Sequence, residues 1–472
     1  MNLLKEHSGL YTDHYQLSMA QGYLLSSKQH VKATFDYFFR KNPFKGAYVI
    51  FAGLSEIADY LENLRFSKED CEYLESIGFE KKVTEYLESF TFKGNIYTPR
   101  EGEVVFPVEP IIRVEGNLVE TQLIETALLN YVNFSSLIAT KAHRIRMVAG
   151  NRLLTDFGLR RAQAHGSILA SKAAIIGGFN STSNVFGAYA FGLESSGTQA
   201  HSWIQSFDDE LSAFRAFAEI YPDKCYLLVD TYDTLRTGIP NAITIGLELE
   251  AKGHRLQGIR LDSGDLAYLS KRARKMLDEA GLHYVKISCS NQLDEYVIRS
   301  LLEQDAPIDF FGVGTRLITG QEDAALDGVY KLTESDGKPR MKISENLEKM
   351  ILPGIKNVHR FYDEDGMMYA DGVALEGETD LKIIYHPYQT YKHSSVENLK
   401  SVVLLEKIME NGKLLNKLPS PYEAAGYVKE VMSKLNPEHK RFEFPHIYKV
   451  GISKKVLDMR TSLINNIRSK ML

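Results

Sequence analysis

The sequence has few cysteines and no long apolar run. Its 472 residues include three cysteines, Cys71, Cys225 and Cys289, and no CxxC pair. This spacing argues against a disulfide framework and against a zinc knuckle. No window approaches the ~18 uninterrupted apolar residues that a membrane-spanning helix needs, and residues 1–7 lack the apolar core of a signal peptide. The sequence therefore predicts a cytoplasmic protein.

The sequence also lacks an excess of basic residues. It has 56 Lys and Arg against 61 Asp and Glu, a formal net charge of -5. This balance argues against a nucleic-acid partner and against a basic surface that binds membranes. Hydrophobic residues make up 44% of the chain and charged residues 25%, which is ordinary for a globular protein. Because the length exceeds one ordinary core, we expect two or three domains.

The pattern of predicted elements divides the chain into three regions. Residues 1–135 mix helices and short strands and predict an N-terminal α+β domain. Residues 136–330 repeat strand-then-helix units, which imply a parallel sheet with right-handed crossovers. The number of units favours a closed, irregular β/α barrel over an open sheet. Residues 331–472 have turn signals between short alternating runs, followed by two helices, and predict a separate C-terminal segment.

The segment 258–265, GIRLDSGD, joins a predicted strand of the barrel to a predicted helix. It brings Arg260, Asp262 and Asp265 to the carboxyl end of a strand, where parallel α/β folds bind ligands. Arg260 offers a planar cation for a carboxylate or phosphate. Asp262 and Asp265 could hold a metal ion or sugar hydroxyls. A simpler interpretation stays open, in which Ser263 or Asp265 caps the helix and Arg260 pairs with an aspartate.

Other predicted strand ends carry polar or small residues. They are 156–161 (DFGLRR), 197–201 (GTQAH), 288–291 (SCSN) and 312–315 (GVGT). The last two segments have small side chains, so that their backbone N–H groups can approach a phosphate, and Thr315 adds a hydroxyl. Alone, a Gly-x-Gly-Thr is often a tight turn and a histidine such as His201 is often a core residue. Together, five segments on one predicted face favour a site for a phosphorylated sugar, a flat anion and Mg²⁺.

From Leu10 to about Asp365 the chain resembles nicotinate phosphoribosyltransferases. The matching segments are LYTDHYQLSMAQGY, FFRKNPF, FAGL, DFGLRRAQ, GGFNSTSNV, GTQAHSW, LLVDTYDT, GIRLDSGDL, CSNQLDE and GVGTRLIT, in this order. That family joins nicotinate to 5-phosphoribosyl-1-pyrophosphate, giving nicotinate mononucleotide and pyrophosphate, the first step of NAD salvage from nicotinate. ATP hydrolysis drives the reaction through a phosphohistidine, and Mg²⁺ assists it.

The resemblance also implies an architecture and an assembly. It implies an irregular β/α barrel plus an α+β domain built from both ends of the chain, so that residues 331–472 would pack back on the N-terminal domain. Members commonly form homodimers in which the active site lies at the subunit boundary. Nicotinate, phosphoribosyl pyrophosphate and ATP would be the small-molecule partners.

Each residue that matches a family motif acquires an implied role. His201 would be the phosphorylated histidine, Thr198 would lie against nicotinate, and Arg260 would pair with its carboxylate. Asp262 and Asp265 would act in catalysis by binding ribose hydroxyls and Mg²⁺. Tyr15, from the neighbouring subunit, and Phe157 would stack on the pyridine ring, and Arg160 would contact nicotinate or phosphate. The 5-phosphate would be bound by Ser290, Asn291, Gly312, Gly314 and Thr315. Pyrophosphate would be contacted by Arg40, Arg340 and Lys342.

Substrate choice depends on the loop 179–185. In nicotinamide-using relatives the matching loop carries an aspartate that accepts from the amide, whereas here the matching position is Ser183 and the loop has no carboxylate. We expect Ser183 to donate to the nicotinate carboxylate; alternatively, it caps the helix that starts near Val185.

Three other functions stay open. The first is a nicotinamide phosphoribosyltransferase. A Schiff-base aldolase would need a lysine at a strand end, and Lys286 lies within a predicted strand without an evident partner. The third is a non-catalytic sensor of pyridine nucleotides. The intact His201 and DSGD segment argue against this hypothesis.

Overall fold

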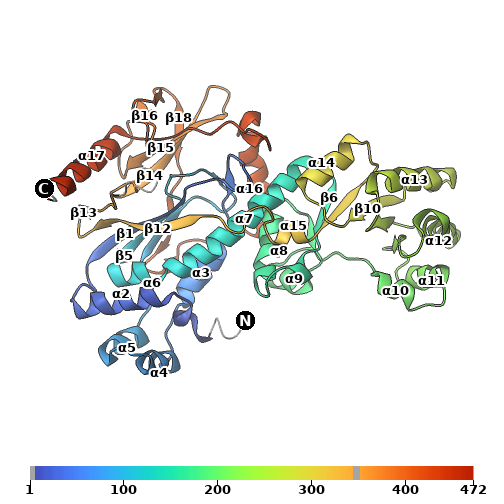
Figure 1. Cartoon of the computed structure of the whole chain (residues 1–472), viewed down its shortest axis with the longest axis horizontal. Helices are drawn as coiled ribbons and strands as arrows, with labels where there is room; N and C mark the ends of the chain where they lie inside the picture. The colour runs from blue at the N-terminus through green and yellow to red at the C-terminus, as the bar shows by residue number, and fades with distance from the viewer. Residues whose placement is uncertain (1–5, 344–350, 471–472) are drawn as a thin grey trace. The chain divides into compact units, whose positions relative to one another are not determined.

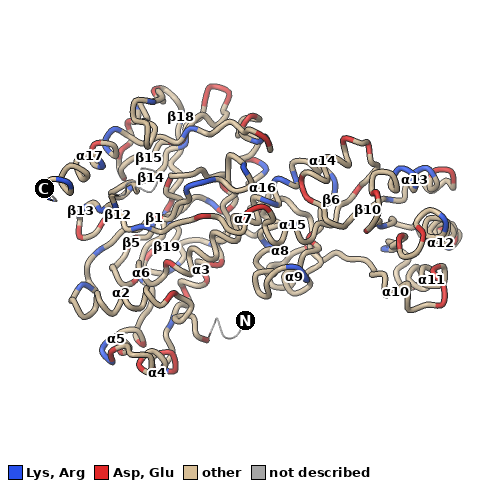
Figure 2. The backbone as a smooth tube through the Cα atoms, in the orientation of Figure 1, with Lys and Arg blue, Asp and Glu red and all other residues tan. Residues whose placement is uncertain are grey.

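The structure is a computed structural model that describes residues 6–343 and 351–470. The chain forms two compact units. The first contains residues 1–137 and 325–472, and the second contains residues 138–324 (Figure 1). The expected fold class, an irregular β/α barrel plus an α+β domain built from both chain ends, is confirmed. Basic and acidic residues are interspersed along both units (Figure 2).

The terminal unit contains a seven-stranded sheet in which strands from both ends of the chain alternate. Its order is β13-β12-β1-β5-β3-β19-β20, and β1 pairs antiparallel with both β12 and β5. Seven of the eight β1 residues are buried, because the strand lies inside the sheet and against the main core. The strands are β1 (Lys32–Phe39), β3 (Asn95–Thr98), β5 (Ile112–Asn117), β12 (Gly328–Ser335), β13 (Lys338–Pro339), β19 (Glu406–Glu410) and β20 (Lys413–Leu414).

A second, six-stranded sheet of this unit has the order β17-β16-β21-β15-β14-β18. Its strands are β14 (Lys356–Tyr362), β15 (Met368–Leu375), β16 (Ile383–Tyr385), β17 (His393–Ser395), β18 (Lys400–Val403) and β21 (Val450–Ile452). The short strands β2 (Val49–Ile50) and β4 (Val104–Val105) form a separate pair. Pro107 and Pro110 lie between β4 and β5, where the chain leaves the ladder because proline cannot donate to it.

The helices of this unit are α2 (His14–Leu25), α3 (Leu54–Asn63), α4 (Lys68–Ser76), α5 (Lys81–Glu88), α6 (Leu118–Leu123), α16 (Pro421–Ser433) and α17 (Lys454–Ser469), and α7 (Glu125–Ala149) contains the boundary between the units. This unit contains a buried group of ion pairs. The fully buried Arg360 contacts Glu103 at 2.6 Å and Asp371 at 2.7 Å. In the described part of the chain, no helix has the length and apolarity to cross a membrane.

The second unit is built on a six-stranded parallel sheet of order β7-β6-β11-β10-β9-β8. Its strands are β6 (Leu153–Asp156), β7 (Ser181–Thr182), β8 (Tyr226–Leu228), β9 (Gly258–Leu261), β10 (Lys286–Ser290) and β11 (Phe310–Val313). Beyond β7, a single parallel bridge joins Thr182 to Ser195. Among the described residues no ladder pairs β7 with β8, which makes the barrel irregular.

Helices alternate with these strands. They are α8 (Gly166–Ile176), α9 (Val185–Phe191), α10 (His201–Gln205), α11 (Glu210–Ile220), α12 (Ile239–Ala251), α13 (Leu266–Glu279), α14 (Glu295–Glu303) and α15 (Thr315–Ile318). β10 begins only at Lys286, after a turn at residues 283–284. The reason is Arg274, whose guanidinium donates to the carbonyls of Leu282 at 2.9 Å and Val285 at 2.6 Å and holds that backbone in a turn.

Candidate active site

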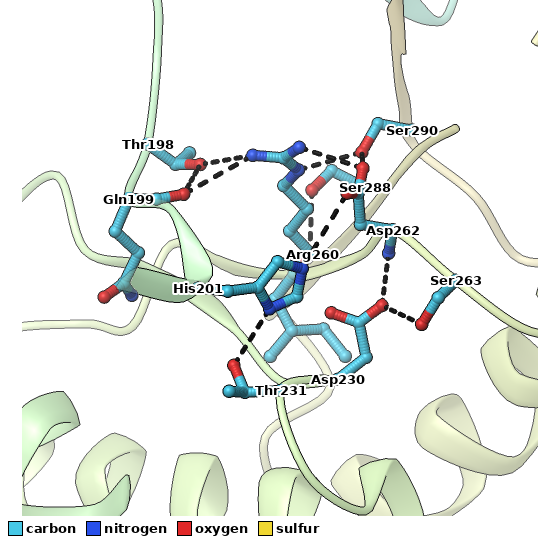
Figure 3. A network of polar contacts seen from close by, with 11 residues as sticks. Thr198, Gln199, His201, Asp230, Thr231, Arg260, Asp262, Ser263, Ser288 and Ser290 are labelled. Atoms are coloured by element: carbon cyan, nitrogen blue, oxygen red, sulfur yellow. Dashed lines mark hydrogen bonds and ion pairs between the residues drawn. The ribbon is translucent and has the colours of Figure 1, made fainter. Parts of the chain in front are cut away.

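Arg260, near the end of β9, is the centre of a polar cluster at the carboxyl ends of the barrel strands (Figure 3). Its Nε donates to Ser290 Oγ at 2.9 Å, and its Nη2 donates to Asp262 Oδ1 at 3.0 Å. Its Nη1 donates to Thr198 Oγ1 at 3.3 Å. The Arg260 side chain is 13% exposed. Three side chains, one from each of three strand ends or loops, therefore fix one orientation of the guanidinium before any ligand arrives.

The ring of Phe157 lies beneath this guanidinium. Arg260 Cζ is 5.3 Å from the ring centroid, within the range of a cation–π contact. The ring can lie there because position 312, in the neighbouring strand β11, is glycine: an added Cβ would lie 2.3 Å from two ring carbons. Gly312 thus makes room for an aromatic side chain, a role that differs from the phosphate contact expected of it.

Asp156 fixes the turn that carries Phe157. Its Oδ1 accepts from the Gly158 N–H at 2.7 Å, and its Oδ2 accepts from the hydroxyls of Ser171 and Thr182, both at 2.8 Å. Burial raises the pKa of the Asp156 carboxyl, and these hydrogen bonds oppose that rise. No feature of the sequence pointed to this role of Asp156.

Asp230 was also missed, although it follows β8 within the LLVDTYDT segment. Its Oδ2 accepts from the Asp262 N–H and from the Ser263 hydroxyl, both at 2.7 Å. Its Oδ1 is buried and has no hydrogen-bond partner among the described residues. The carboxylate therefore holds the segment after β9 in place with one oxygen and leaves the other available.

His201 is the first residue of α10 and faces the same carboxylates. Its Nε2 lies 3.8 Å from Asp262 Oδ2, and its Nδ1 lies 3.1 Å from Thr231 Oγ1. The imidazole is 39% exposed and the Asp262 side chain 30%. If Nδ1 carries the proton and donates to Thr231, the Nε2 lone pair is free to act as a nucleophile.

The structure separates the two aspartates of the DSGD segment. Asp265 is the N-cap of α13, and its Oδ1 accepts from the Tyr268 N–H at 3.0 Å. Asp262 instead pairs with Arg260, so both parts of the simpler interpretation of this segment are observed. Among the described residues, Asp265 makes no hydrogen bond or ion pair with Arg260 or His201, and its hydrogen bond with the Tyr268 N–H stabilises the start of α13.

Ser183 follows β7, and its N–H donates to the Asp156 carbonyl at 2.8 Å. The alternative that Ser183 caps the next helix is wrong, because the N-cap of α9 is Asn184, which accepts from the Gly187 N–H at 3.0 Å. Within the described residues the Ser183 hydroxyl makes no hydrogen bond. It is therefore available to a ligand.

The expected phosphate segments lie at the ends of β10 and β11. Ser290 accepts from Arg260 and donates to Asp262, so its hydroxyl positions that pair. Asn291 and Gln292 follow with φ values of 91° and 48°. Two successive non-glycine residues in the left-handed region are costly, and such strain concentrates at functional sites.

Gly314 and Thr315 lie where β11 passes into α15, a helix of four residues. Arg160 lies in the short helix Leu159–Arg161, exposed, without a hydrogen bond or ion pair to a described residue. The remaining expected residues, Tyr15, Arg40, Arg340 and Lys342, belong to the terminal unit. Tyr15 is 49% exposed on α2, and Arg40 Cζ is 5.8 Å from the centroid of the Phe38 ring.

The carboxylates of the cluster fit Mg²⁺ in combination with a substrate. Within the described ranges, no group of three His, Cys, Asp or Glu side chains is placed to hold a metal ion. Mg²⁺ needs fewer protein ligands, since it binds one or two carboxylates, several waters and the phosphates of a substrate. Asp230, with its unpartnered Oδ1, and Asp262, with its exposed edge, supply such a pair.

Comparison with known proteins identifies the family. Models of the nicotinate phosphoribosyltransferase N-terminal domain, the family itself and its C-terminal domain match residues 10–133, 153–378 and 355–460. A nicotinate phosphoribosyltransferase from Bacillus subtilis (strain 168) is 44% identical over 475 residues, covering 98% of this chain and 96% of that protein. The chain belongs to the nicotinate phosphoribosyltransferase family.

Further relatives agree with this assignment. A nicotinate phosphoribosyltransferase from Caenorhabditis elegans is 36% identical over 514 residues, covering 95% of this chain and 92% of that protein. Human nicotinic acid phosphoribosyltransferase has a crystal structure that superposes with a TM-score of 0.87 at 30% identity, covering 96% of this chain and 99% of that one. The resemblance drawn from the motifs is thus confirmed, and in this family member the cluster around Arg260 is the candidate active site.

Proposed function

We propose that the chain catalyses the ATP-coupled reaction of nicotinate with 5-phosphoribosyl-1-pyrophosphate. The products are nicotinate mononucleotide, pyrophosphate, ADP and phosphate, with water consumed. The observation that carries the proposal is the arrangement of His201, Arg260 and Asp262, which combines a nucleophilic imidazole, an oriented cation and a carboxylate. In a member of this family, these are the groups that the reaction needs.

Nicotinate binding is assigned to the Arg260 side of the cluster. Nicotinate is a flat anion, so its carboxylate needs a cation and its ring needs an apolar face. Arg260 supplies the cation, Phe157 supplies the face, and the Ser183 hydroxyl supplies a further donor. Because the guanidinium is already oriented by three side chains, little conformational entropy is lost when the anion binds.

Transfer of the phosphoribosyl group needs no strong general base. The pyridine nitrogen attacks C1 of the ribose with its own lone pair, while the C1–O bond breaks and its electrons leave with pyrophosphate. Positive charge develops on the ribose, and the carboxylates of Asp230 and Asp262 stabilise it. When bound, Mg²⁺ would be held by these carboxylates and would neutralise the departing pyrophosphate. Positioning of the two reactants supplies much of the remaining rate.

His201 would link ATP cleavage to this transfer. Its Nε2 would accept the γ-phosphoryl group of ATP and later release it to water. Thr231 would fix the imidazole through Nδ1, and Asp262, 3.8 Å from Nε2, would stabilise the positive charge on the ring. Asp265 is assigned a structural role at the start of α13.

We further propose that two chains share each active site. Tyr15 and Arg40 belong to the terminal unit, and the exposed Tyr15 ring would stack on the pyridine of the partner chain. Arg40, with a buried Nε that lacks a described partner, would contact the pyrophosphate. Arg340 and Lys342 would assist at the same anion.

One assay tests the proposed function. Nicotinate and nicotinamide are compared side by side with the phosphoribosyl donor, with and without ATP, and the mononucleotide products are quantified. We expect nicotinate mononucleotide, with ATP increasing its yield, and little nicotinamide mononucleotide. A preference for nicotinamide would support the alternative function, a nicotinamide phosphoribosyltransferase. The Schiff-base alternative is disfavoured because Lys286 lies at the amino end of β10 and pairs with Asp309 at 3.2 Å.

A further inference from the structure

The terminal unit contains a large cavity of about 1110 Å³, which the proposed reaction does not use. It is lined by residues 107–108, 384, 386–389, 392–394 and 446–451. The lining therefore combines the loop that joins β16 to β17 with the segment that leads into β21. Its size is sufficient for a small organic ligand.

The lining of this cavity is basic. It contains three histidines and two lysines and has no Asp or Glu, the basic residues being His386, Lys392, His393, His446 and Lys449. Both lysines are exposed, and neither pairs with a carboxylate of a described residue.

Other lysines of this unit do form such pairs. Lys382 contacts Glu397 at 3.2 Å, and Lys454 contacts Asp458 at 2.9 Å. The positive charge at the cavity is thus uncompensated, whereas the charges of Lys382 and Lys454 are neutralised.

A buried arginine adds to this charge. Arg460 of α17 is 8% exposed, and its Nη1 donates to the carbonyl of Pro387, a lining residue, at 2.6 Å. No carboxylate of the described residues pairs with it, and burial lowers the pKa of its guanidinium. Because a buried cation without a counter-charge is costly, an anion in the adjacent cavity would stabilise this arrangement.

The loop also presents an oriented hydrogen-bond donor. His386 Nδ1 accepts from the backbone N–H groups of Tyr388 and Gln389, both at 3.1 Å. The proton of the neutral ring must therefore be on Nε2, which can donate to an anion. Tyr448 forms part of the wall and is held rigid by stacking on Phe106 at 3.8 Å between ring centroids. Ile447, 81% exposed, extends the apolar surface beside it.

Two other cavities, both in the barrel unit, are also lined by basic residues, but in each of them a basic residue is paired with a carboxylate. In the cavity of about 170 Å³ between α11 and α12, Arg215 pairs with Glu248 at 2.6 Å. In the cavity of about 530 Å³ at the amino ends of the strands, Lys286 pairs with Asp309. Because these two cations are already neutralised by carboxylates, both cavities have less need of an added anion.

We propose that the cavity of the terminal unit binds a phosphate-bearing small molecule that carries a flat ring. Lys392, Lys449 and His386 surround the phosphate, and the ring packs against Ile447 and the tyrosine wall. This site lies outside the Arg260 cluster and does not depend on the reaction assigned to it.

Site-resolved acetylation of lysines on the full chain tests this proposal. The probes are AMP, adenosine and inorganic phosphate, each at the same ionic strength, set with KCl, and peptides are quantified by mass spectrometry. At an AMP concentration about four times its dissociation constant, acetylation of Lys392 and Lys449 should slow roughly fivefold. Lys455, exposed on α17, serves as the internal control and should be unaffected. Stronger protection by AMP than by inorganic phosphate would support the proposal, because it shows that the ring contributes. Equal protection by inorganic phosphate, or no protection by AMP, would overturn it.

A matched pair of variants completes the test. Lys449→Ala should raise the AMP concentration that half-protects Lys392 by roughly tenfold or more, since a hydrogen bond to a charged group contributes about 1.5–3 kcal/mol. Lys455→Ala should leave that concentration unchanged. The proposal is overturned if KCl alone protects both lysines as well as AMP does, if adenosine protects equally, or if Lys449→Ala has no effect.

Discussion

The contact between Gly312 and Phe157 gives a prediction whose size follows from the structure. In Gly312→Ala, the new Cβ would lie 2.3 Å from two carbons of the Phe157 ring, far inside van der Waals contact. The ring must leave its place beneath Arg260. Overpacking of this kind costs about 1–3 kcal/mol, and for a unit of this size each kcal/mol lowers the melting temperature by roughly 2–4 °C.

Activity should fall together with stability. The displaced ring loses an aromatic contact with nicotinate and a cation–π contact with Arg260, about 1–2.5 kcal/mol together, or roughly a 5- to 70-fold loss in kcat/KM for nicotinate. The assay is a double-mutant cycle of Gly312→Ala and Phe157→Ala, read by kcat/KM and by thermal unfolding. Because the alanine at 312 meets no ring when Phe157 is absent, the two effects should be strongly non-additive.

Gly22→Ala is the matched control. Position 22 lies inside α2, and an added Cβ would meet no atom within 4 Å. The substitution should therefore be neutral or slightly stabilising. If Gly312→Ala were as well tolerated as Gly22→Ala, or if its effect simply added to that of Phe157→Ala, the packing of Phe157 over Gly312 would be wrong.

Three further predictions concern the proposed reaction. His201→Ala should unfold at the wild-type temperature but lose ATP stimulation of turnover, and full stimulation in steady-state assays would refute its role. Mixing inactive Tyr15→Ala chains with inactive Asp262→Ala chains should restore some activity, because one hybrid site keeps both residues; no recovery after proven subunit exchange would contradict a shared site. Ser183→Asp should lower kcat/KM for nicotinate by about an order of magnitude or more, because two carboxylates at an effective dielectric near 20 repel by several kcal/mol; an unchanged value would end this account of specificity.

Much of the site could be predicted because it depends on where strands end. In a parallel sheet, carboxyl ends share one edge, so the segments after β6, β9, β10 and β11 had to meet. The grouping of Arg260 with Ser290, which ends the neighbouring strand β10, follows from this rule alone. The joining of both chain ends in one unit came from the family resemblance, since strands such as β1 and β12 pair across about 300 residues.

The remainder depends on hydrogen bonds that sequence does not display. Asp156 is buried and Asp230 half-buried, and each accepts hydrogen bonds from residues distant in the sequence, so neither differs in sequence from an ordinary strand-end aspartate. Asp262 and Asp265 are alike in sequence, and only the start of α13 separates a helix cap from an ion-pair partner. Arg274 delays the start of β10 through hydrogen bonds to carbonyls eight and eleven residues away. The periodicity of apolar residues gives no sign of these contacts.

The cavity of the terminal unit was missed for a similar reason. Its lining comes from residues 107–108, 384, 386–389, 392–394 and 446–451, and no motif links these segments. In the sequence, each lysine of the lining looks like an ordinary surface charge. Only the structure shows that, among the described residues, these lysines lack carboxylate partners and that the buried Arg460 lies beside the cavity.

The most direct test of the account is the phosphorylation of His201. The chain is incubated with ATP labelled on its γ-phosphate, and the label is mapped by peptide analysis under alkaline conditions, which preserve phosphohistidine. We predict an acid-labile label on His201 that disappears when nicotinate and the phosphoribosyl donor are added, as nicotinate mononucleotide forms. His201→Ala should take up no label. Nicotinate mononucleotide formed with full ATP stimulation and no label on His201, or the same label in His201→Ala, would contradict the account.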